Sequence, residues 1–260
     1  MIDINRLRFW CDSSKTTIFT HLAKIGFIIT DTPAGLLAYK NNNSQILAVG
    51  HADIVPGLES YKSQKYDDLF VSPALDDRLG LYIIVELLSN VDILITDNEE
   101  IGQSTAQFFE TEKNYNWMFQ LDRHGYDVVL YQYDSSDSRQ YLKDFNVGKG
   151  TFSDICYLDH LECIGFNFGI GYYFEHTEYC NCDIQKVNQR IAKIENFLVN
   201  NSNISMPYIC DDSLYNDLDI LCEYCIHEIA EYYDSLQDVM VCDNCRQFLG
   251  IPKMGVDRLQ

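Results

Sequence analysis

The sequence predicts an α/β fold: a layered domain with a mostly parallel central sheet, followed by a small C-terminal zinc ribbon. Two observations predict the layered domain, namely short apolar segments typical of buried strands and segments of helical periodicity that alternate with them. A third observation, two C-x2-C pairs near the C-terminus, predicts the ribbon. We expect the α/β domain at residues 1–204 and the ribbon tail at residues 205–260.

The composition is that of a globular protein, and it excludes several function classes. Of the 260 residues, 47% are hydrophobic and 22% are charged, which is ordinary usage for a chain with a packed core. The net charge of −20 disfavours a nucleic-acid partner, because phosphate binding needs Lys and Arg. The longest apolar, uncharged run, 163–174, is too short to span a membrane. Charges at Asp3, Arg6 and Arg8 interrupt any secretory signal, so we expect a cytoplasmic protein.

The individual elements follow from periodicity and turn residues. Apolar residues recur at helical spacing within 14–25, and the apolar segments 27–30 and 36–39 flank a turn at Pro33, which predicts a helix and then a hairpin. Further apolar runs predict strands at 45–50, 91–96, 117–121, 128–133 and 163–169. Helical patterns predict helices at 78–88, 104–112, 154–161 and 183–199. The Asn- and Ser-rich stretch 200–205 is typical of a linker.

Four cysteines near the C-terminus have the spacing of a structural zinc site. Cys222 and Cys225 form the first pair, Cys242 and Cys245 form the second, and sixteen residues separate the pairs. Two thiolates from one turn can converge on a single ion at about 2.3 Å. Four unrelated thiols, or a site in which His227 replaces one cysteine, are the alternatives. The other six of the ten cysteines show no such grouping.

Residues that can bind metal or move protons follow the predicted strands at their carboxyl ends, where open α/β sheets build their sites. In chain order they are His51 and Asp53 in AVGHAD, Asp76 and Asp77 in SPALDDRLG, Asp97, Glu99 and Glu100 in ILITDNEEIG, Asp122 in WMFQLDRHG, and His176 in GYYFEHTE. Taken singly, each has an ordinary explanation as a helix cap or a surface charge. Their common position at strand ends favours a shared metal site.

These motifs resemble those of the co-catalytic di-zinc exopeptidases, a clan that includes bacterial leucyl aminopeptidases, tetrahedral aminopeptidases, peptidase T and glutamate carboxypeptidase. The resemblance extends from Ala48 to Glu178 and uses HAD, LDDRLG, TDNEEIG, LDR, GTFSDI and GYYFEHTE. It implies a three-layer α/β/α sandwich around a mixed, mostly parallel central sheet, with two zinc ions at the carboxyl ends of the strands. The implied ligands are His51 and Asp122 for one ion, Glu100 and His176 for the other, and Asp76 as a bridge.

The resemblance also implies the roles of the residues beside those ligands. Glu99 is expected to be the general base, and Asp53 is expected to orient His51. A cis peptide bond is expected between Asp76 and Asp77. The short gaps between the motifs leave no room for the inserted domain that several branches of the clan contain.

This ligand set predicts a hydrolase. Two zinc ions would acidify a shared water toward a pKa of about 7, and Glu99 can take up its proton and pass it to the leaving amine. Cobalt or manganese could occupy the same ligands. We therefore expect a zinc-dependent aminopeptidase with two catalytic zinc ions and one structural zinc ion, acting on a peptide or small amide.

Two other functions stay open at this stage. The same ligands could deacylate a small amide or an amino-acid conjugate, because nothing in them distinguishes these substrates. A non-catalytic protein could instead use the zinc ribbon to bind a protein or nucleic-acid partner, with the α/β domain as a scaffold. The presence of Glu99 argues against such a scaffold, which needs no proton acceptor.

We expect a preference for a free substrate N-terminus. A carboxypeptidase needs a cation near the metals to pair with the terminal carboxylate. The arginines near the motifs, Arg78 and Arg123, are expected to pair with neighbouring acids instead. Carboxylates that could receive an ammonium group are Glu175, Glu178, Asp97 and Asp154.

Overall fold

The computed structural model describes residues 1–208 together with three short segments of the tail, 232–234, 239–241 and 256–258. The chain divides into two compact units, Met1–Ile209 and Cys210–Gln260. In the second unit the described strands form an antiparallel sheet in the order β13-β12-β14. Their bounds are Tyr232–Asp234 for β12, Val239–Val241 for β13 and Val256–Arg258 for β14. The cysteines of the predicted zinc ribbon, Cys222, Cys225, Cys242 and Cys245, lie outside the described residues.

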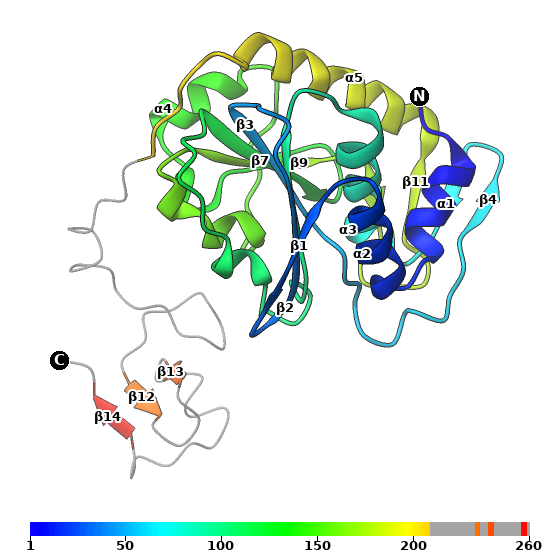
Figure 1. Cartoon of the computed structure of the whole chain (residues 1–260), viewed down its shortest axis with the longest axis horizontal. Helices are drawn as coiled ribbons and strands as arrows, with labels where there is room; N and C mark the ends of the chain where they lie inside the picture. Colours follow the sequence, from blue (N-terminus) through cyan, green and yellow to red (C-terminus); the bar gives the residue numbers. More distant parts are fainter. Residues whose placement is uncertain (209–231, 235–238, 242–255, 259–260) are drawn as a thin grey trace. The chain divides into compact units, whose positions relative to one another are not determined.

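A seven-stranded sheet in the order β1-β2-β6-β3-β7-β9-β8 forms the centre of the first unit (Figure 1). The strands are β1 (Ile28–Thr32), β2 (Gly35–Lys40), β3 (Ile46–His51), β6 (Asp92–Thr96), β7 (Trp117–Arg123), β8 (Val128–Val129) and β9 (Gly165–Gly169). β3 pairs in parallel with β6 and β7, and β7 pairs in parallel with β9, whereas the edges are antiparallel. The predicted mixed, mostly parallel α/β fold is confirmed.

Burial on both faces explains why the central strands read as continuous apolar runs. Every residue of β3 and of β6 is buried. Figure 1 shows the helices α1, α2 and α3 on one side of this sheet and α4 on the other. The helices are α1 (Ile4–Asp12), α2 (Lys15–Lys24), α3 (Leu75–Tyr82), α4 (Ser136–Arg139) and α5 (Ile184–Asn201). A π-helical turn, η1 (Ile83–Leu87), extends α3.

Polar side chains define where the long helices begin. Asp3 accepts hydrogen bonds from two backbone amides of α1, and Asp183 does the same for α5. Along α5, Phe197 packs edge-on against Trp117, Phe166 and Phe168 of the sheet, with ring centroids 5.3 to 5.6 Å apart. These aromatic contacts fix the predicted amphipathic helix on the core.

A second, antiparallel sheet in the order β10-β11-β5-β4 was absent from the sequence prediction. Its strands are β4 (Gln64–Tyr66), β5 (Leu69–Val71), β10 (Tyr172–Tyr173) and β11 (Asn181–Asp183). They are two or three residues long, too short for a periodic pattern to show in the sequence. The loop between β10 and β11 carries His176, so this small sheet places one of the candidate ligands.

Three predicted elements are shorter in the structure than expected. The expected helix 104–112 is one 3-10 turn, η2 (Thr105–Phe108), because the Ser104 hydroxyl accepts from the Ala106 amide and competes with helical bonding. The expected helix 154–161 is two such turns, η5 (Asp154–Tyr157) and η6 (Asp159–Leu161). The expected strand 128–133 stops after β8, because Tyr131 has a φ of 48° and begins η3 (Tyr131–Tyr133). Another 3-10 turn, η4 (Gln140–Leu142), follows α4.

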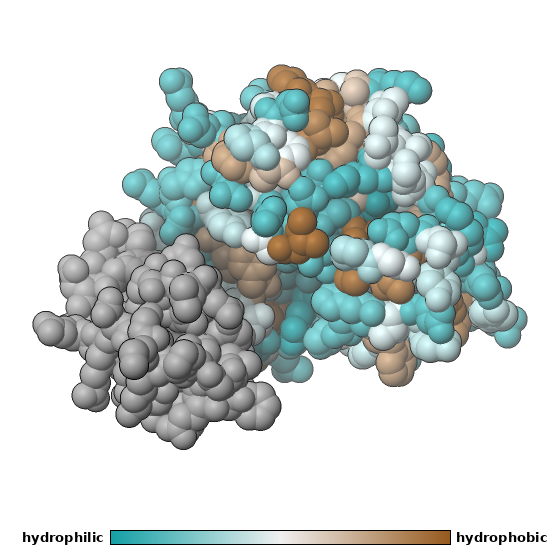
Figure 2. All heavy atoms as spheres, turned by 90° about the horizontal axis from the view of Figure 1, so that it is seen from below, coloured by the Kyte–Doolittle hydropathy of each residue, from teal (hydrophilic) through white to brown (hydrophobic). Residues whose placement is uncertain are grey.

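Large apolar surfaces are not a feature of the face drawn in Figure 2, where hydrophobic residues form small, separate patches among hydrophilic ones. Among the described residues, no helix combines the length and the apolar character that crossing a membrane requires.

Candidate metal and catalytic site

The parallel strands of the central sheet bring the sequence-predicted residues to one edge. His51 is the last residue of β3, and Asp122 lies near the end of β7. Glu99 and Glu100 follow β6 in the turn after Thr96. Asp76 and His176 come from outside the central sheet, at the start of α3 and in the loop after β10. The peptide bond between Asp76 and Asp77 is cis, as the resemblance implies.

Two groups of candidate metal ligands form at this edge, and they share Asp76. One group is His51, Asp76 and Asp122, and the other is Asp76, Glu100 and His176; in each, the ligand atoms lie within 4.8 Å of one another. His51 Nε2 is 3.5 Å from Asp122 Oδ1. His176 Nε2 is 3.2 Å from Asp76 Oδ2 and 3.3 Å from Glu100 Oε2. The shared carboxylate would let Asp76 bridge two ions.

The chemistry of these groups fits divalent cations. His51 Nε2, Asp122 Oδ1 and Glu100 Oε1 are buried, and none of them has a hydrogen-bond partner within the described residues. Buried polar atoms are normally satisfied, because leaving them unpaired costs about 1 to 3 kcal/mol each. Imidazole nitrogens and carboxylate oxygens are the ligands that zinc, cobalt and manganese accept. The residues present therefore suit a pair of such ions.

Charge repulsion at the site points to the same conclusion. Burial, together with the carboxylates of Asp77 and Asp76, raises the pKa of Asp122 well above its usual value. Burial also raises the pKa of Glu100 to about 7, with Asp76 adding to the effect. The chain thus places more carboxylates here than its own cations neutralise, and a bound cation would stabilise their ionised forms.

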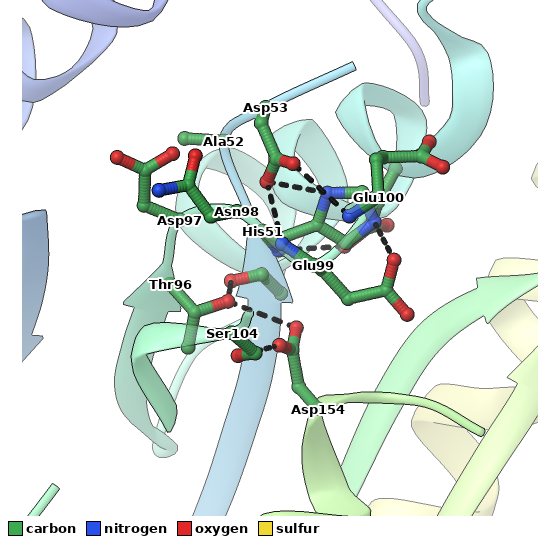
Figure 3. A network of polar contacts seen from close by, with 12 residues as sticks. His51, Ala52, Asp53, Thr96, Asp97, Asn98, Glu99, Glu100, Ser104 and Asp154 are labelled. Carbon is green, nitrogen blue, oxygen red and sulfur yellow. Dashed lines mark hydrogen bonds and ion pairs between the residues drawn. The ribbon is translucent and has the colours of Figure 1, made fainter. Parts of the chain in front are cut away.

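Asp53 holds two parts of the site in register (Figure 3). Its Oδ1 lies 3.3 Å from Nδ1 of His51, which leaves Nε2 of that imidazole directed at Asp122. The same carboxylate accepts the backbone amides of Glu99 and Glu100 at 3.2 and 3.1 Å. Although burial opposes it, the contact with His51 and the hydrogen bond from the Glu100 amide lower the pKa of Asp53.

Glu99 faces the pocket beside the two ligand groups. Its Oε2 lies 3.9 Å from His51 Nε2. Burial, reinforced by the nearby carboxylates of Asp154 and Glu100, raises the pKa of Glu99 to about 8. A carboxylate that lies beside the ligand groups and lines the same pocket is placed to accept and return a proton.

Asp77, adjacent to the shared ligand, turns away from the site. Its Oδ2 accepts the backbone amide of His51 at 3.0 Å, so it fixes the end of β3. Gly50 and Gly80 leave room for this carboxylate, because a Cβ at Gly50 would lie 2.8 Å from Asp77 Oδ2 and one at Gly80 would collide with Oδ1. The two adjacent aspartates therefore have different tasks, one at the candidate metals and one in the backbone framework.

A buried network around Asp154 supports the ligands, and sequence analysis assigned Asp154 a different role. Asp154 is 0% exposed and accepts from Thr96 Oγ1 at 2.9 Å, from Gln120 Nε2 at 3.2 Å and from the Ser104 hydroxyl (Figure 3). It therefore cannot receive a substrate ammonium group as expected. Gln120 Nε2 also donates to Asp122 Oδ2 at 3.1 Å, which links this network to a candidate ligand.

Tyr172 belongs to the site although the sequence did not predict a role for it. Its buried hydroxyl donates to Asp76 Oδ1 at 2.9 Å, and burial with the Asp76 charge raises the pKa of Tyr172. No motif singles out this tyrosine, because the contact joins residues 96 positions apart. The only signal in the sequence is its place in the same GYYFEHTE segment as His176.

The other charged residues that the sequence suggested for substrate binding have partners within the chain. Asp97 pairs with Lys15 at 2.7 Å, so it is not free for a substrate. Glu175 lines the pocket and pairs with His124 at 2.6 Å. Arg123 pairs with Asp127 at 3.2 Å, as expected of an arginine beside acids. Arg78 was expected to pair with neighbouring acids, and this expectation was wrong. Its buried guanidinium donates to the backbone carbonyls of Trp10, Ser13 and Ala52.

Comparison with known proteins identifies the fold. No protein-family model and no curated protein matches the sequence. Solved structures do match, among them aminopeptidase PepT from Bacillus cereus, with 10% identity, 75% of this chain and 96% of that chain covered, and a TM-score of 0.55. A tripeptidase from Staphylococcus aureus matches with 10% identity, coverage of 75% and 96%, and a TM-score of 0.56. An aminopeptidase from the archaeon Desulfurococcus kamchatkensis matches with 10% identity, coverage of 75% and 93%, and a TM-score of 0.57. At these identities the chain shares the fold of these peptidases.

Proposed function

We propose that this chain is a two-metal hydrolase of peptide bonds that acts as an aminopeptidase. The observation that carries the proposal is the pair of ligand groups joined through Asp76, with the carboxylate of Glu99 beside them in the lining of the same pocket. The fold shared with aminopeptidases and a tripeptidase supports the same reaction class.

Each site residue then has a defined task. His51 and Asp122 would hold one zinc ion, Glu100 and His176 the second, and Asp76 would bind both. Such a pair of ions, when bound, supplies Lewis-acid activation of a water molecule and of the scissile carbonyl. Asp53 keeps the His51 imidazole in the tautomer whose Nε2 is free.

Glu99 would perform the proton transfers. Its carboxylate takes the proton from the attacking water and returns it to the nitrogen of the leaving amine, so that the amide bond breaks with a neutral leaving group. The turn that carries Glu99 is fixed by the amide contacts to Asp53, and this keeps the base in position. A general base held in this way increases the reaction rate about 10²- to 10⁴-fold.

The direction of cleavage is proposed from the charges around the pocket. Glu175 is a carboxylate at the pocket that could meet a substrate ammonium group. Arg123, which lines this pocket, pairs with Asp127, and the buried Arg78 donates to backbone carbonyls, so neither arginine is free to bind a terminal carboxylate. These engagements favour a free N-terminus as the end from which cleavage proceeds.

Metal analysis combined with a substrate panel tests this function. We expect about three zinc ions per chain, two at this site and one in the predicted ribbon. Aminoacyl substrates should be hydrolysed faster than N-acylated or carboxyl-terminal ones, and a chelator should stop the reaction until metal is restored. Hydrolysis that survives complete removal of the metals would refute the proposal, and preferred cleavage of N-acyl amino acids would make the chain a deacylase.

A further inference from the structure

The candidate ligand His176 lacks the side-chain support that His51 has. Nδ1 of His51 lies 3.3 Å from Asp53 Oδ1, so a carboxylate orients that imidazole. Nε2 of His176 faces Asp76 and Glu100 at 3.2 and 3.3 Å, and this is the nitrogen that would bind a metal ion. Within the described part of the chain, no hydrogen bond or ion pair engages Nδ1 of His176. The side chain is also 57% exposed, so its orientation depends on the backbone that carries it.

The backbone at His176 has a conformation that residues other than glycine disfavour. The loop 174–180 joins β10 to β11, and in it Phe174 has a φ of 60° and His176 a φ of 59°. Thr177 Oγ1 donates to Phe174 O at 2.7 Å, which stabilises the turn from within. Backbone conformations of this kind persist where the surrounding structure enforces them. A contact from outside the loop, close to His176, is therefore expected.

Glu175, the residue before His176, makes such a contact. Its Oε1 lies 2.6 Å from Nδ1 of His124. His124 follows β7 and is two positions from Asp122, a candidate ligand of the other group. The Glu175–His124 contact therefore connects the segment that carries one candidate ligand to the loop that carries another.

The segment on the His124 side of this contact is itself fixed. The Gly125 amide donates to Tyr172 O at 2.9 Å, and the Gly171 amide donates to Gly125 O at 2.7 Å. These backbone bonds hold the base of the loop against the end of β7. The contact between His124 and Glu175 continues the connection to the residue next to the candidate ligand.

The exposure of the pair indicates a local role. The side chains of His124 and Glu175 are 38% and 33% exposed. Ion pairs with this much access to water add little to the stability of a whole domain. Their effect is felt by the groups beside them, and His176 is one peptide bond from Glu175.

We propose that the His124–Glu175 contact is a clamp that holds the His176 imidazole in place for the metal ion it would share with Asp76 and Glu100. His124 and Glu175 are positioning residues, because neither belongs to the two ligand groups found among the described residues. The inference rests on the proposed two-metal function. Oε1 of Glu175 makes the contact, so Oε2 can still meet the substrate ammonium group proposed above.

A double-mutant cycle with metal affinity as the readout tests the clamp. Metal-free protein is titrated with Co²⁺ against a chelator, and the d–d absorption reports cobalt bound by nitrogen and oxygen ligands, apart from the thiolate charge-transfer band of the predicted ribbon. His124→Ala and Glu175→Ala should each weaken the binding of one of two cobalt ions about tenfold. The double variant should lose no more than either single variant, because both changes break the same contact.

Two further variants separate positioning from charge. Glu175→Gln removes the negative charge but keeps an oxygen that can accept from His124 Nδ1, so most of the affinity should remain. Tyr179→Phe is the matched control, because Tyr179 is exposed in the same loop and lies outside the pocket. The thermal transitions of all metal-free variants should match that of the wild type. An equal loss of affinity in Glu175→Gln and Glu175→Ala would overturn the clamp, and so would a lowered thermal transition in the alanine variants.

Hydrolysis of the dipeptide Leu-Leu by the same preparations distinguishes failure of the clamp from failure of the proposed function. If Glu175→Ala raises KM while both cobalt ions bind as in the wild type, Glu175 acts only on the substrate, and the clamp is wrong while the peptidase function stands. If the loaded wild type hydrolyses no peptide but the cycle shows the expected loss of affinity, the proposed function fails and the clamp stands.

Discussion

Acidic residues that are adjacent in the sequence have different roles at this site. Asp76 offers oxygens to both ligand groups, while the next residue, Asp77, fixes the backbone of His51. Glu99 and Glu100 are likewise adjacent, yet Glu100 lies 3.3 Å from His176 and Glu99 points to the pocket. Consecutive residues in a turn point in different directions, so a pair of acids can divide into a ligand and a base.

Substitution of the two glutamates should separate these roles. Glu99→Gln is expected to lower kcat by about 10² to 10⁴ while both catalytic metals stay bound, because it removes a proton acceptor and not a ligand. Glu100→Gln, the matched variant of the neighbouring residue, should lose metal instead. Metal content per chain and kcat, measured on the same preparations, check both expectations. Full activity in a Glu99→Gln protein that retains both metals would show that Glu99 is not the general base.

The carboxylate of Asp154 should matter even though it does not reach the pocket. Because it joins Thr96, Ser104 and Gln120, Asp154→Ala is expected to weaken metal binding or turnover about 10- to 100-fold, as loss of ligand-supporting contacts does. Asp159→Ala, in the next 3-10 turn, is the control and should behave as the wild type. Competition with a chelator measures the metal affinity of each variant. Equal affinities in Asp154→Ala and Asp159→Ala would contradict the claim that the Asp154 network supports the metal ligands.

Three of the candidate ligands lie at the ends of strands whose apolar pattern is visible in the sequence: His51 ends β3, Asp122 lies near the end of β7, and Glu100 follows β6. A parallel sheet brings such strand ends together, and the resemblance to the di-zinc exopeptidases implied the rest of the ligand set. Tyr172 was not predictable, since its contact with Asp76 joins segments far apart in the chain. The presence of Asp154 in the GTFSDI motif was noticed, but its burial, which decides its role, appears only in the fold.

At the scale of elements, the buried strands of the central sheet were recognised more reliably than the short helices or the short strands of the second sheet. Strands such as β3 and β6 are buried on both faces, so their composition alone marks them. The segments at η2 and η5 have apolar residues at helical spacing, yet at η2 the Ser104 hydroxyl accepts from the Ala106 amide, which favours a single turn. Where a serine side chain competes for a backbone amide in this way, periodicity overstates helix length.

The start of β6 depends on one buried acid. Asp92 is 0% exposed, and its two oxygens accept from backbone amides and side chains of three neighbouring segments. The donors are Tyr39, Asn42, Ser44, Lys113 and Tyr115. Although burial opposes it, the contact with Lys113 and these hydrogen bonds lower the pKa of Asp92. The acid therefore ties the β2–β3 connection to the central sheet.

Asp92→Ala is expected to lower the free energy of unfolding by about 3 kcal/mol at neutral pH, because several buried donors lose their acceptor. Since the folded-state pKa lies below the unfolded value of about 3.9, this contribution is present above that pH and is lost as the pH falls through the folded-state pKa. Urea unfolding at pH 7 and at pH 3 should show a smaller difference from the wild type at pH 3. Asp31→Ala, at an exposed position in β1, is the control. A difference that grows toward low pH would contradict the assignment.

At the scale of the whole molecule, the residues assigned to hydrolysis all lie in the first compact unit. That unit has its own buried core, which runs from Leu7 to Met206. The second unit contributes none of the residues found at the candidate site within the described chain. The cysteine spacing in the tail predicts a separate structural zinc, so metal content and hydrolysis should be separable by substitution.

Cys242→Ser is therefore expected to release about one zinc ion per chain, because a four-thiolate site loses most of its affinity with one ligand. The thermal transition of the 1–209 unit and peptide hydrolysis should both be retained, since structural zinc stabilises only the part of the chain that binds it. Cys156→Ser is the control: it removes a half-buried free thiol of the first unit and should leave the zinc content at the wild-type value. Zinc content by elemental analysis, together with calorimetry and turnover of Leu-Leu, gives the outcome. An unchanged zinc content in Cys242→Ser would show that Cys242 is not a ligand of a structural zinc. Parallel loss of zinc and hydrolysis would show that the tail supports the catalytic unit.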